Sequence, residues 1–359
     1  MLVRSASDSY LEDPIFVNQR PPRNDDELEE FLSRPSPEVV DALRRTSGDV
    51  IVLGAGGKMG PSLTTMVRRA CDAIVDGRTV TAVSRFSSPE VAARLENSGI
   101  RVVRAELGDR DSIGRLPDAP NVIYMAGQKF GTKDLPSLTW AVNTLVPAMV
   151  AERYAESRIV AFSTGNVYPL SPATSPGSRE SDSLTPIGEY ANSCVGRERV
   201  LEHVSRTHGT LMAIVRLNYA VDLRYGVLVD IAHRIAAGEP VPVDMGYVNV
   251  IWQGDANAQA IRALTLASSP PLAINVTGPE RLSVRETAKR LGTLLGTAPR
   301  LEGSEARDAL LSDTSLAQSL FGLPTVSSDV LIDWVASWVA RGGTRLGKAT
   351  KFEVRDGRF

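Results

Sequence analysis

The sequence predicts an α/β protein with a doubly wound parallel sheet and a smaller C-terminal substrate-binding domain. Two observations carry this prediction. From residue 49 onward, short runs rich in β-branched residues alternate with longer helical segments, the pattern of a parallel sheet covered on both faces. A glycine-rich segment, Gly54-Ala-Gly-Gly-Lys-Met-Gly60, follows the first of these runs and opens the first helix.

The strands are expected where the β-branched runs lie, and the helices where apolar residues recur at helical spacing. The expected strands span residues 50–53, 80–84, 101–105, 122–125, 159–163 and 213–217. The expected helices span residues 61–74, 89–96, 135–155, 227–237, 256–267, 284–295 and 330–340. Pro147 should kink the helix at 135–155, because proline lacks a backbone donor and its ring crowds the preceding turn.

Composition narrows the function classes. The 359 residues are 43% hydrophobic, enough for a large core, and the 40 basic and 42 acidic side chains give a net charge of -2. We therefore expect neither nucleic acid nor a membrane as a partner. Cys71 and Cys194 are too few for a disulfide framework and lack the spacing of a metal cluster. Since the sequence has no signal-peptide pattern and no long apolar stretch, we expect a cytoplasmic protein.

The glycine-rich segment has the pattern of a Rossmann dinucleotide-binding loop. Gly54 can turn sharply after the strand, Gly57 lets the backbone approach a phosphate, and Gly60 lets the helix pack on the strand. The helix that follows presents its N-terminal amides to an anion. We expect this loop, including Lys58 and Met59, to bind the phosphates of a dinucleotide; a purely structural tight turn is the alternative.

Four parts are expected along the chain. Residues 1–48 form an N-terminal helical extension, with one helix near 26–33 and another that Ser36 caps and that has Pro37 in its first turn. Residues 49–219 form the NAD(P)-binding Rossmann domain. Residues 220–341 form mainly a substrate-binding domain, with some segments returning to the Rossmann domain. Residues 342–359 are a basic tail, expected to be a solvated or loosely docked end.

The end of the second strand usually distinguishes the two nicotinamide dinucleotides. An acidic side chain there accepts from the ribose 2′-hydroxyl of NAD, whereas an arginine accommodates the 2′-phosphate of NADP. The sequence has Ser84-Arg85 at this point and no acid. A guanidinium presents a fork of donors that suits a phosphate, so we expect NADP, with NAD as the second choice. The alternative for Arg85 is a solvated loop residue.

Further motifs follow the strands in order. They are GxxGxxG from Gly54 to Gly60, Gly108-Asp109, Ala126-Gly127-Gln-Lys129, Asn143, Ser163-Thr164-Gly-Asn-Val-Tyr168 and Tyr190-Ala-Asn-Ser-Cys194. Over residues 49–340 the chain resembles the extended short-chain dehydrogenases/reductases, the NAD-dependent epimerase/dehydratase family that includes sugar 4-epimerases. The resemblance implies that Asp109 contacts adenine and that Lys129 reaches the pyrophosphate. It also implies that Ala126, Gly127 and Asn143 contact the cofactor.

The resemblance also assigns catalytic roles. Tyr190 matches the tyrosine of the family's YxxxK motif, which is the general acid/base and also contacts the cofactor, and Thr164 polarises the reacting oxygen. Cys194 occupies the lysine position. Because that lysine lowers the pKa of the tyrosine, its loss predicts a slower enzyme. A pKa higher by about two units makes the phenolate about a hundredfold scarcer, a cost near 2.7 kcal/mol.

Several alternatives stay open around this missing lysine. Arg197 can share a helix face with Tyr190 and could supply the positive charge. Cys194 could act as a catalytic thiol, although a small buried residue is the plainer interpretation. The plainer interpretation of Tyr190 itself, given the broken motif, is that it only packs.

We therefore expect an NAD(P)-dependent oxidoreductase or epimerase that acts on a hydroxyl or carbonyl of a sugar-like small molecule. An NAD(P)-binding regulatory protein of the same fold without turnover is the alternative. The resemblance also implies a homodimer, in which the helices carrying Asn143 and Tyr190 pair across a two-fold axis. The expected substrate contacts are Lys129, Asn166, Asn218 and Tyr219, with Arg224, Tyr247 and Trp252 as further candidates.

Overall fold

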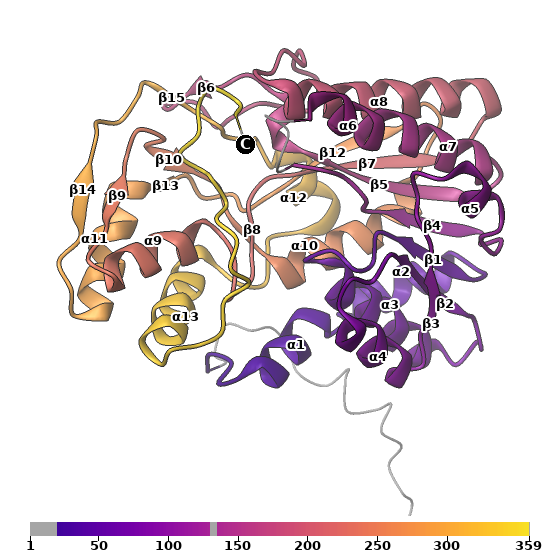
Figure 1. Cartoon of the computed structure of the whole chain (residues 1–359), viewed down its shortest axis with the longest axis horizontal. Coiled ribbons are helices and arrows are strands. Elements are labelled where there is room, and N and C mark those ends of the chain that lie inside the picture. The colour runs from indigo at the N-terminus through magenta and orange to yellow at the C-terminus, as the bar shows by residue number, and fades with distance from the viewer. Residues whose placement is uncertain (1–19, 130–134, 359) are drawn as a thin grey trace, which may run out of the picture.

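The computed structural model describes residues 20–129 and 135–358, and Figure 1 shows two lobes within it. The larger lobe contains a seven-stranded sheet of order β12-β7-β5-β4-β1-β2-β3. Its strands are β1 (Val50–Leu53), β2 (Val80–Ser84), β3 (Arg101–Arg104), β4 (Asn121–Tyr124), β5 (Arg158–Thr164), β7 (Met212–Leu217) and β12 (Leu272–Val276). All neighbouring pairs are parallel, and Val50 lies opposite Val80 on one side and Asn121 on the other. The predicted doubly wound parallel sheet is confirmed; β12 was not predicted.

Helices cover both faces of this sheet because its strands are apolar on both sides. Along β1, Val50 and Val52 face one core while Ile51 and Leu53 face the other. The first core contains residues of α2 (Pro37–Arg45), α3 (Gly60–Ile74), α4 (Pro89–Asn97), α10 (Gln253–Arg262) and α12 (Ser315–Phe321). The second contains residues of α5 (Arg110–Gly114), α7 (Val146–Arg153) and α8 (Glu189–His208).

The smaller lobe has a separate apolar core. Its helices are α9 (Val227–Ala236), α11 (Val284–Leu295) and α13 (Ser328–Ala340). Short strand pairs complete it: β8 (Ala220–Val221) with β11 (Ile251–Trp252), β9 (Pro240–Pro242) with β14 (Arg300–Glu302), β10 (Tyr247–Val248) with β13 (Leu282–Ser283), and β6 (Ser171–Pro172) with β15 (Asp308–Ala309). In sequence these segments alternate with β12, α10 and α12, which pack in the larger lobe.

The N-terminal extension joins the two lobes. The first helix, α1 (Asp25–Ser33), buries Leu28 and Leu32 in the core of the smaller lobe, and the ring of Phe31 lies 5.8 Å from that of Trp334. The next helix, α2, packs on the sheet instead. Residues 1–19 of the predicted extension lie outside the described residues.

The expected side-chain cap of α2 does not form. Ser36 occupies the N-cap position, but its hydroxyl makes no hydrogen bond to the first helical amides. It bonds the Glu38 carboxylate instead, which lowers the pKa of Glu38. The cap of α1 is provided by Asn24, whose side chain accepts from the Glu27 amide at 2.9 Å.

The irregularity expected at Pro147 takes the form of a π turn. The helix at 135–155 divides into α6 (Pro136–Trp140), a π-helical turn at Ala141–Leu145, and α7. Pro147 lies in the first turn of α7, and the Val146 amide donates to the Ala141 carbonyl, five residues back. Since proline lacks a donor and crowds the carbonyl four residues earlier, the wider turn absorbs the conflict.

The expectation of a solvated or loosely docked tail is wrong. Thr350 is 2% exposed and Phe352 is 1% exposed, the latter within the core of the smaller lobe. In Figure 1 the tail leaves α13 and runs between the two lobes toward the end of the chain. The prediction was based on the basic residues of the tail and overlooked Phe352, whose apolar side chain anchors the tail in the core of the smaller lobe.

Candidate active site

The two lobes enclose a cleft at the carboxyl ends of β5 and β7. A cavity of about 180 Å³ lies in it, lined among others by Ser163, Leu217, Ala220, Val227 and Gln253. Eight of the residues predicted from sequence line it as well: Lys58, Met59, Lys129, Thr164, Asn166, Tyr190, Asn218 and Tyr219. Open α/β sheets bind ligands at this edge, next to the point where the strand order reverses.

The glycine loop is shaped by close approaches of the backbone. Gly54 has φ +93°, and a Cβ there would lie 2.7 Å from the Ala126 amide nitrogen. A Cβ on Gly60 would lie 2.4 Å from the Ala55 carbonyl oxygen, so only glycine lets α3 approach the turn this closely. At Gly57 the nearest atom to such a Cβ is the Gly54 carbonyl oxygen, at 3.3 Å. The loop therefore forms a narrow backbone cradle at the start of α3, which suits a phosphate.

The residues expected to select the cofactor lie at the end of β2. The Ser84 hydroxyl faces Gly56, where a Cβ would lie 2.7 Å from Oγ. The Arg85 side chain is 79% exposed, and its guanidinium lies 3.6 Å from the Glu106 carboxylate at the end of β3. Both members of this pair are exposed, so the contact contributes little to stability.

Asp109 caps α5. Its carboxylate accepts from the Asp111 and Ser112 amides at 3.1 and 3.2 Å and from the Ser112 hydroxyl at 2.8 Å. The hydrogen bonds from Ser112 and Asp111 hold the pKa of Asp109 below its usual value. The contact of this residue with adenine stays a prediction.

The side chain of Asn143 holds the loop after β4 in place. Asn143 is 0% exposed: its side chain accepts from the Gln128 amide and donates to the Gln128 carbonyl, both at 2.9 Å. It also donates to the Ser193 hydroxyl. Asn143 therefore fixes the course of Ala126-Gly127-Gln128-Lys129, and a direct contact with a cofactor stays a prediction.

Arg197 places a positive charge next to Gly127 in the loop after β4. Its guanidinium donates to the Asn143 carbonyl at 3.3 Å, the Asn143 side-chain oxygen at 2.6 Å and the Phe162 carbonyl at 2.7 Å. A Cβ on Gly127 would lie 2.6 Å from this guanidinium, so the glycine lets the loop lie directly on it.

Tyr190, Thr164 and Cys194 come together at the start of α8. Thr164 accepts at Oγ1 from the amide and side-chain nitrogens of Asn166, at 3.1 and 3.0 Å, so its own proton can be donated elsewhere. It is hydrogen-bonded to Tyr190, which is also hydrogen-bonded to Cys194. Cys194 itself is 0% exposed and packs against Val167. It does not line the cavity.

The electrostatics of this triplet follow from its burial. Burial and then the neighbouring Cys194 raise the pKa of Tyr190 well above its usual value, while Arg197 and the hydrogen bond from Thr164 lower it. Burial also raises the pKa of the Cys194 thiol. Of the groups that favour the phenolate, Arg197 therefore has the largest effect.

Two lysines bring positive charge into the cleft. Burial lowers the pKa of Lys58 to about 7, helped by the charge of Lys129, and burial lowers the pKa of Lys129 to about 8. The Lys58 ammonium lies 3.1 Å from the centroid of the Tyr225 ring, a cation–π contact between the lobes. The Lys129 ammonium lies 5.9 Å from the centroid of the Tyr190 ring.

A buried ion pair anchors α8 beside the sheet. Arg216 on β7 pairs with Glu198 on α8 at 2.7 Å, and Glu198 also accepts from the Ser163 hydroxyl at 2.5 Å. Arg216 donates in addition to the Tyr168 hydroxyl at 2.6 Å. With these partners in place the buried charges are satisfied, and the position of Tyr190 relative to β5 is fixed.

The smaller lobe contributes fewer of the predicted contacts. Asn218 and Tyr219 line the cavity, but Arg224 is bound to Asp222 and Glu29. Trp252 packs against Trp334 in the core, with ring centroids 5.5 Å apart, so its proposed contact with substrate is wrong. Seven lining residues were missed from the sequence: Ser163, Leu217, Ala220, Tyr225, Val227, Gln253 and Thr350.

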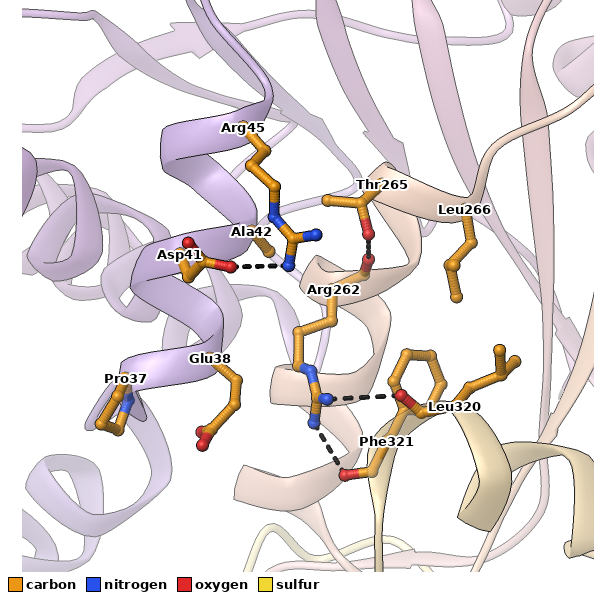
Figure 2. A pocket seen from close by; sticks show the side chains of 10 residues that line it. All are labelled: Pro37, Glu38, Asp41, Ala42, Arg45, Arg262, Thr265, Leu266, Leu320 and Phe321. Atoms are coloured by element: carbon orange, nitrogen blue, oxygen red, sulfur yellow. Dashed lines mark hydrogen bonds and ion pairs between the residues drawn. The ribbon is translucent and has the colours of Figure 1, made fainter.

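A second hollow, of about 400 Å³, lies between α2, α10 and α12 (Figure 2). The guanidinium groups in it are bound within the protein. Arg45 pairs with Asp41 at 2.6 Å, and Arg262 donates to the Phe321 and Leu320 carbonyls at 3.0 and 3.4 Å. We therefore place the candidate site in the cleft and not in this hollow.

Comparison with known proteins gives a family. The sequence model of the NAD dependent epimerase/dehydratase family matches residues 50–243. No curated protein matches the chain. In the described part of the chain, no helix combines the length and apolar character needed to span a bilayer, and no group of three His, Cys, Asp or Glu side chains could hold a metal ion.

Several solved structures share the fold. One is a UDP-glucuronic acid 4-epimerase mutant from Bacillus cereus with NAD and a fluorinated UDP-glucuronic acid, at TM-score 0.68 and 17% identity, over 82% of this chain and 99% of that one. Another is a UDP-glucose 4-epimerase from Thermus thermophilus with NAD, at TM-score 0.65 and 22% identity over the same shares. A UDP-Glc/GlcNAc 4-epimerase from Campylobacter jejuni matches at TM-score 0.66 and 18% identity, over 82% of this chain and 100% of that one.

Proposed function

Because the chain belongs to the NAD-dependent epimerase/dehydratase family, we propose that its cleft binds a nicotinamide dinucleotide and catalyses oxidoreduction or epimerisation at a hydroxyl or carbonyl of a sugar-like small molecule. The observation that carries this proposal is the meeting of Tyr190, Thr164 and two partly buried lysines, Lys58 and Lys129, at one cavity. Solved structures of the same fold are complexes with NAD, and some also hold a UDP-sugar.

The cofactor fits the residues of the glycine loop. The loop whose tight course depends on Gly54 and Gly60 can take the pyrophosphate on its backbone amides, with Lys58 and Lys129 as counter-charges. Met59 and Tyr190 line the path from this cradle to the reacting centre. Bound there, the nicotinamide would accept or donate a hydride.

NADP is the cofactor we propose. Arg85 is exposed, and its one ion pair among the described residues is with the exposed Glu106, so its guanidinium can turn to a 2′-phosphate. Ser84 offers a hydroxyl and no carboxylate for the ribose. The NAD complexes of related folds make NAD the second choice.

Proton transfer falls to Tyr190. The Thr164 proton is free to point at Tyr190 or a substrate oxygen, because both Asn166 donors already occupy the Thr164 oxygen. Cys194 does not carry the positive charge of the family's lysine. Arg197 on α8 and Lys129 in the loop after β4 supply that charge instead. A cation near a phenol favours its ionised form.

A second candidate function is a cofactor-binding regulatory protein without turnover. It is favoured by the strong upward shift of the Tyr190 pKa, which burial and Cys194 cause. A phenol that stays protonated at neutral pH cannot act as a base, although it can still donate a hydrogen bond.

A homodimer and a cytoplasmic location complete the proposal. Apolar side chains on and beside α6 and the π turn are exposed, namely Leu135, Leu138, Trp140 and Leu145. The helix α6 lies beside α8 (Figure 1), and a second copy packed on this face would cover these side chains. Light scattering should give twice the chain mass, and Leu145→Glu should give a monomer. A wild-type monomer at micromolar concentration would contradict the dimer.

The function is tested by cofactor titration followed by turnover. Fluorescence titration of the wild-type chain should show saturable binding of NADPH, tighter than that of NADH. Turnover is then assayed with a panel of keto and hydroxy sugars in free and nucleotide-linked form. Binding without turnover across the panel would favour the regulatory protein, and absence of binding would overturn both candidates.

A further inference from the structure

The C-terminal segment 342–358, here called the strap, runs between the two lobes (Figure 1), and its Thr350 lines the cavity of the candidate site. It begins on the smaller lobe, where the Trp338 indole donates to the Thr344 carbonyl at 3.0 Å and the Leu346 amide donates to the Arg224 carbonyl at 3.2 Å. Its first part therefore continues the surface of α13. The remainder of the strap lies over the candidate site.

At the cavity the strap connects both lobes through Thr350. The Thr350 amide and hydroxyl donate to one carboxylate oxygen of Asp230 on α9, at 2.7 and 2.6 Å. From the other side, the Lys129 ammonium donates to the Thr350 carbonyl at 3.4 Å. Asp230 is buried, which raises its pKa, and the two Thr350 hydrogen bonds oppose that rise. Thr350 therefore forms part of the cavity wall.

Beyond the cavity the strap is anchored again. Phe352 is buried in the core of the smaller lobe, and Arg355 pairs with Asp308 and donates to the Asp308 carbonyl at 2.9 Å. Gly357 lies against Gly188, the residue before α8: a Cβ on Gly188 would be 2.5 Å from the Gly357 carbonyl oxygen. The strap thus ends at the helix that carries Tyr190.

The strap leaves little space for a ligand. The cavity of about 180 Å³ is smaller than the roughly 300–1,000 Å³ of most small-molecule sites. A neighbouring space, lined by Asn166, Tyr168, Val354, Arg355 and Gly357 among others, has only about 30 Å³, room for about one water. The Arg355 guanidinium on this side is already bound to Asp308 and does not offer its charge to a diphosphate.

Resting on the proposed function, we propose that this strap determines substrate size. It restricts the site to a monosaccharide-sized polyhydroxy compound and excludes a nucleoside diphosphate sugar. The polar groups around the cavity suit such a ligand, since Thr164, Asn166, Asn218 and Tyr219 offer hydroxyl and amide partners for sugar hydroxyls. Beside the cavity, Val354, Arg355 and Gly357 leave a space of only about 30 Å³, which is too small for a nucleotide.

The test uses full-length variants that loosen the strap without changing a residue that lines the cavity. Phe352→Ser removes the apolar anchor, and Arg355→Ala breaks the pair with Asp308 at a site where folding is at little risk. Arg358→Ala changes an exposed residue on the same strap and serves as the matched control. Limited proteolysis measures the release of the strap in each variant.

Binding of UDP-glucose is then measured by calorimetry at saturating NADPH. We expect no detectable binding to the wild-type chain or to Arg358→Ala, and at least tenfold tighter binding to whichever loosened variant shows a released strap, with the NADPH affinity unchanged within about twofold. Equal UDP-glucose affinity in wild type and loosened variants overturns the inference, as does a released strap without any gain in binding. Failure of wild-type NADPH binding overturns the proposed function instead, so the two failures are distinguishable.

Discussion

The two ends of the cleft are built in different ways. At the glycine-loop end, backbone atoms of the turn between β1 and α3, together with the Ala126 backbone after β4, form the cradle, and the approach distances at Gly54 and Gly60 define its shape. At the reacting end, side chains from distant segments meet: the Lys129 ammonium contacts the Thr350 carbonyl across 221 residues of sequence. A site made of backbone tolerates little change in shape, whereas a site made of side chains can change its chemistry by single substitutions. Position 194 is an example, since a cysteine there leaves the fold intact.

The largest expected effect is at the reacting end. Tyr190→Phe should lower turnover by about 10²- to 10⁴-fold, because the ring still packs while the proton donor is lost. Cofactor affinity should stay within about twofold. Tyr154→Phe is the control, since it removes a buried hydroxyl that donates to the Pro117 carbonyl and does not line the cavity. Turnover that survives Tyr190→Phe would move the acid/base role to Lys129 or Cys194.

The next effect tests the backbone cradle. Gly54→Ala should weaken cofactor binding by about a hundredfold, because its Cβ meets the Ala126 amide and its positive φ disfavours alanine. Gly99→Ala is the matched control: Gly99 also has a positive φ, +73°, but a Cβ there meets nothing within 4 Å. Both variants therefore share the backbone strain. Equal cofactor affinities in the two would show that the cradle does not hold the phosphates.

Cofactor choice should respond to Arg85 more modestly. Arg85→Ala should weaken NADPH binding about tenfold by removing one charge-assisted contact with the 2′-phosphate, and leave NADH binding unchanged. Arg110→Ala, another exposed arginine in a surface ion pair, controls for net charge. An unchanged ratio of the two affinities after Arg85→Ala would contradict the NADP assignment.

Cofactor affinity should also depend on pH. In the free protein the pKa is about 7 for Lys58 and about 8 for Lys129, and a bound pyrophosphate raises both. Affinity is therefore greatest below pH 7 and falls as pH rises from 7 to 9, by at most about tenfold per pH unit for each lysine. Fluorescence titration across this range measures the slope. Lys129→Met should flatten it, and the exposed Lys289→Met should not; an affinity that rises with pH would contradict the assignment.

The smallest effect is expected at Cys194. The thiol is buried and its pKa is raised by that burial, so it stays neutral and contributes packing. Cys194→Ala should change turnover by less than about threefold while costing about 1 kcal/mol of unfolding free energy, measured by urea denaturation. A loss of activity as large as that of Tyr190→Phe would make the thiol a catalytic group.

Local signals in the sequence predicted most of the fold. The β-branched runs at 50–53 and 80–84 gave strands with the expected bounds, and the glycine spacing located the βαβ unit. The strand β12 (Leu272–Val276) was missed because its short apolar run follows a region where the alternation loosens. Its assignment to the sheet comes from pairing with β7, a contact between distant segments.

The site could be predicted only where one motif supplies the residue. Thr164 and Tyr190 lie next to each other because β5 and α8 bring their motifs to the same edge. Tyr225 and Thr350 belong to no motif. Tyr225 reaches the cavity through the contact of its ring with Lys58, and Thr350 reaches it because the strap passes Lys129. Trp252 could be read as a substrate contact because its indole has one polar atom. The rest of its ring is apolar, and it packs against Trp334 in the core instead.

The proposed function depends on hydride transfer in the cleft, with Tyr190 giving or taking the hydroxyl proton. It is tested most directly with a hydroxy substrate from the turnover panel that carries deuterium at the reacting carbon. If the cleft transfers a hydride, the deuterium stays on the product or appears on the nicotinamide, and none reaches the solvent. Deuterium released to water during turnover would show proton abstraction from carbon and would contradict hydride transfer.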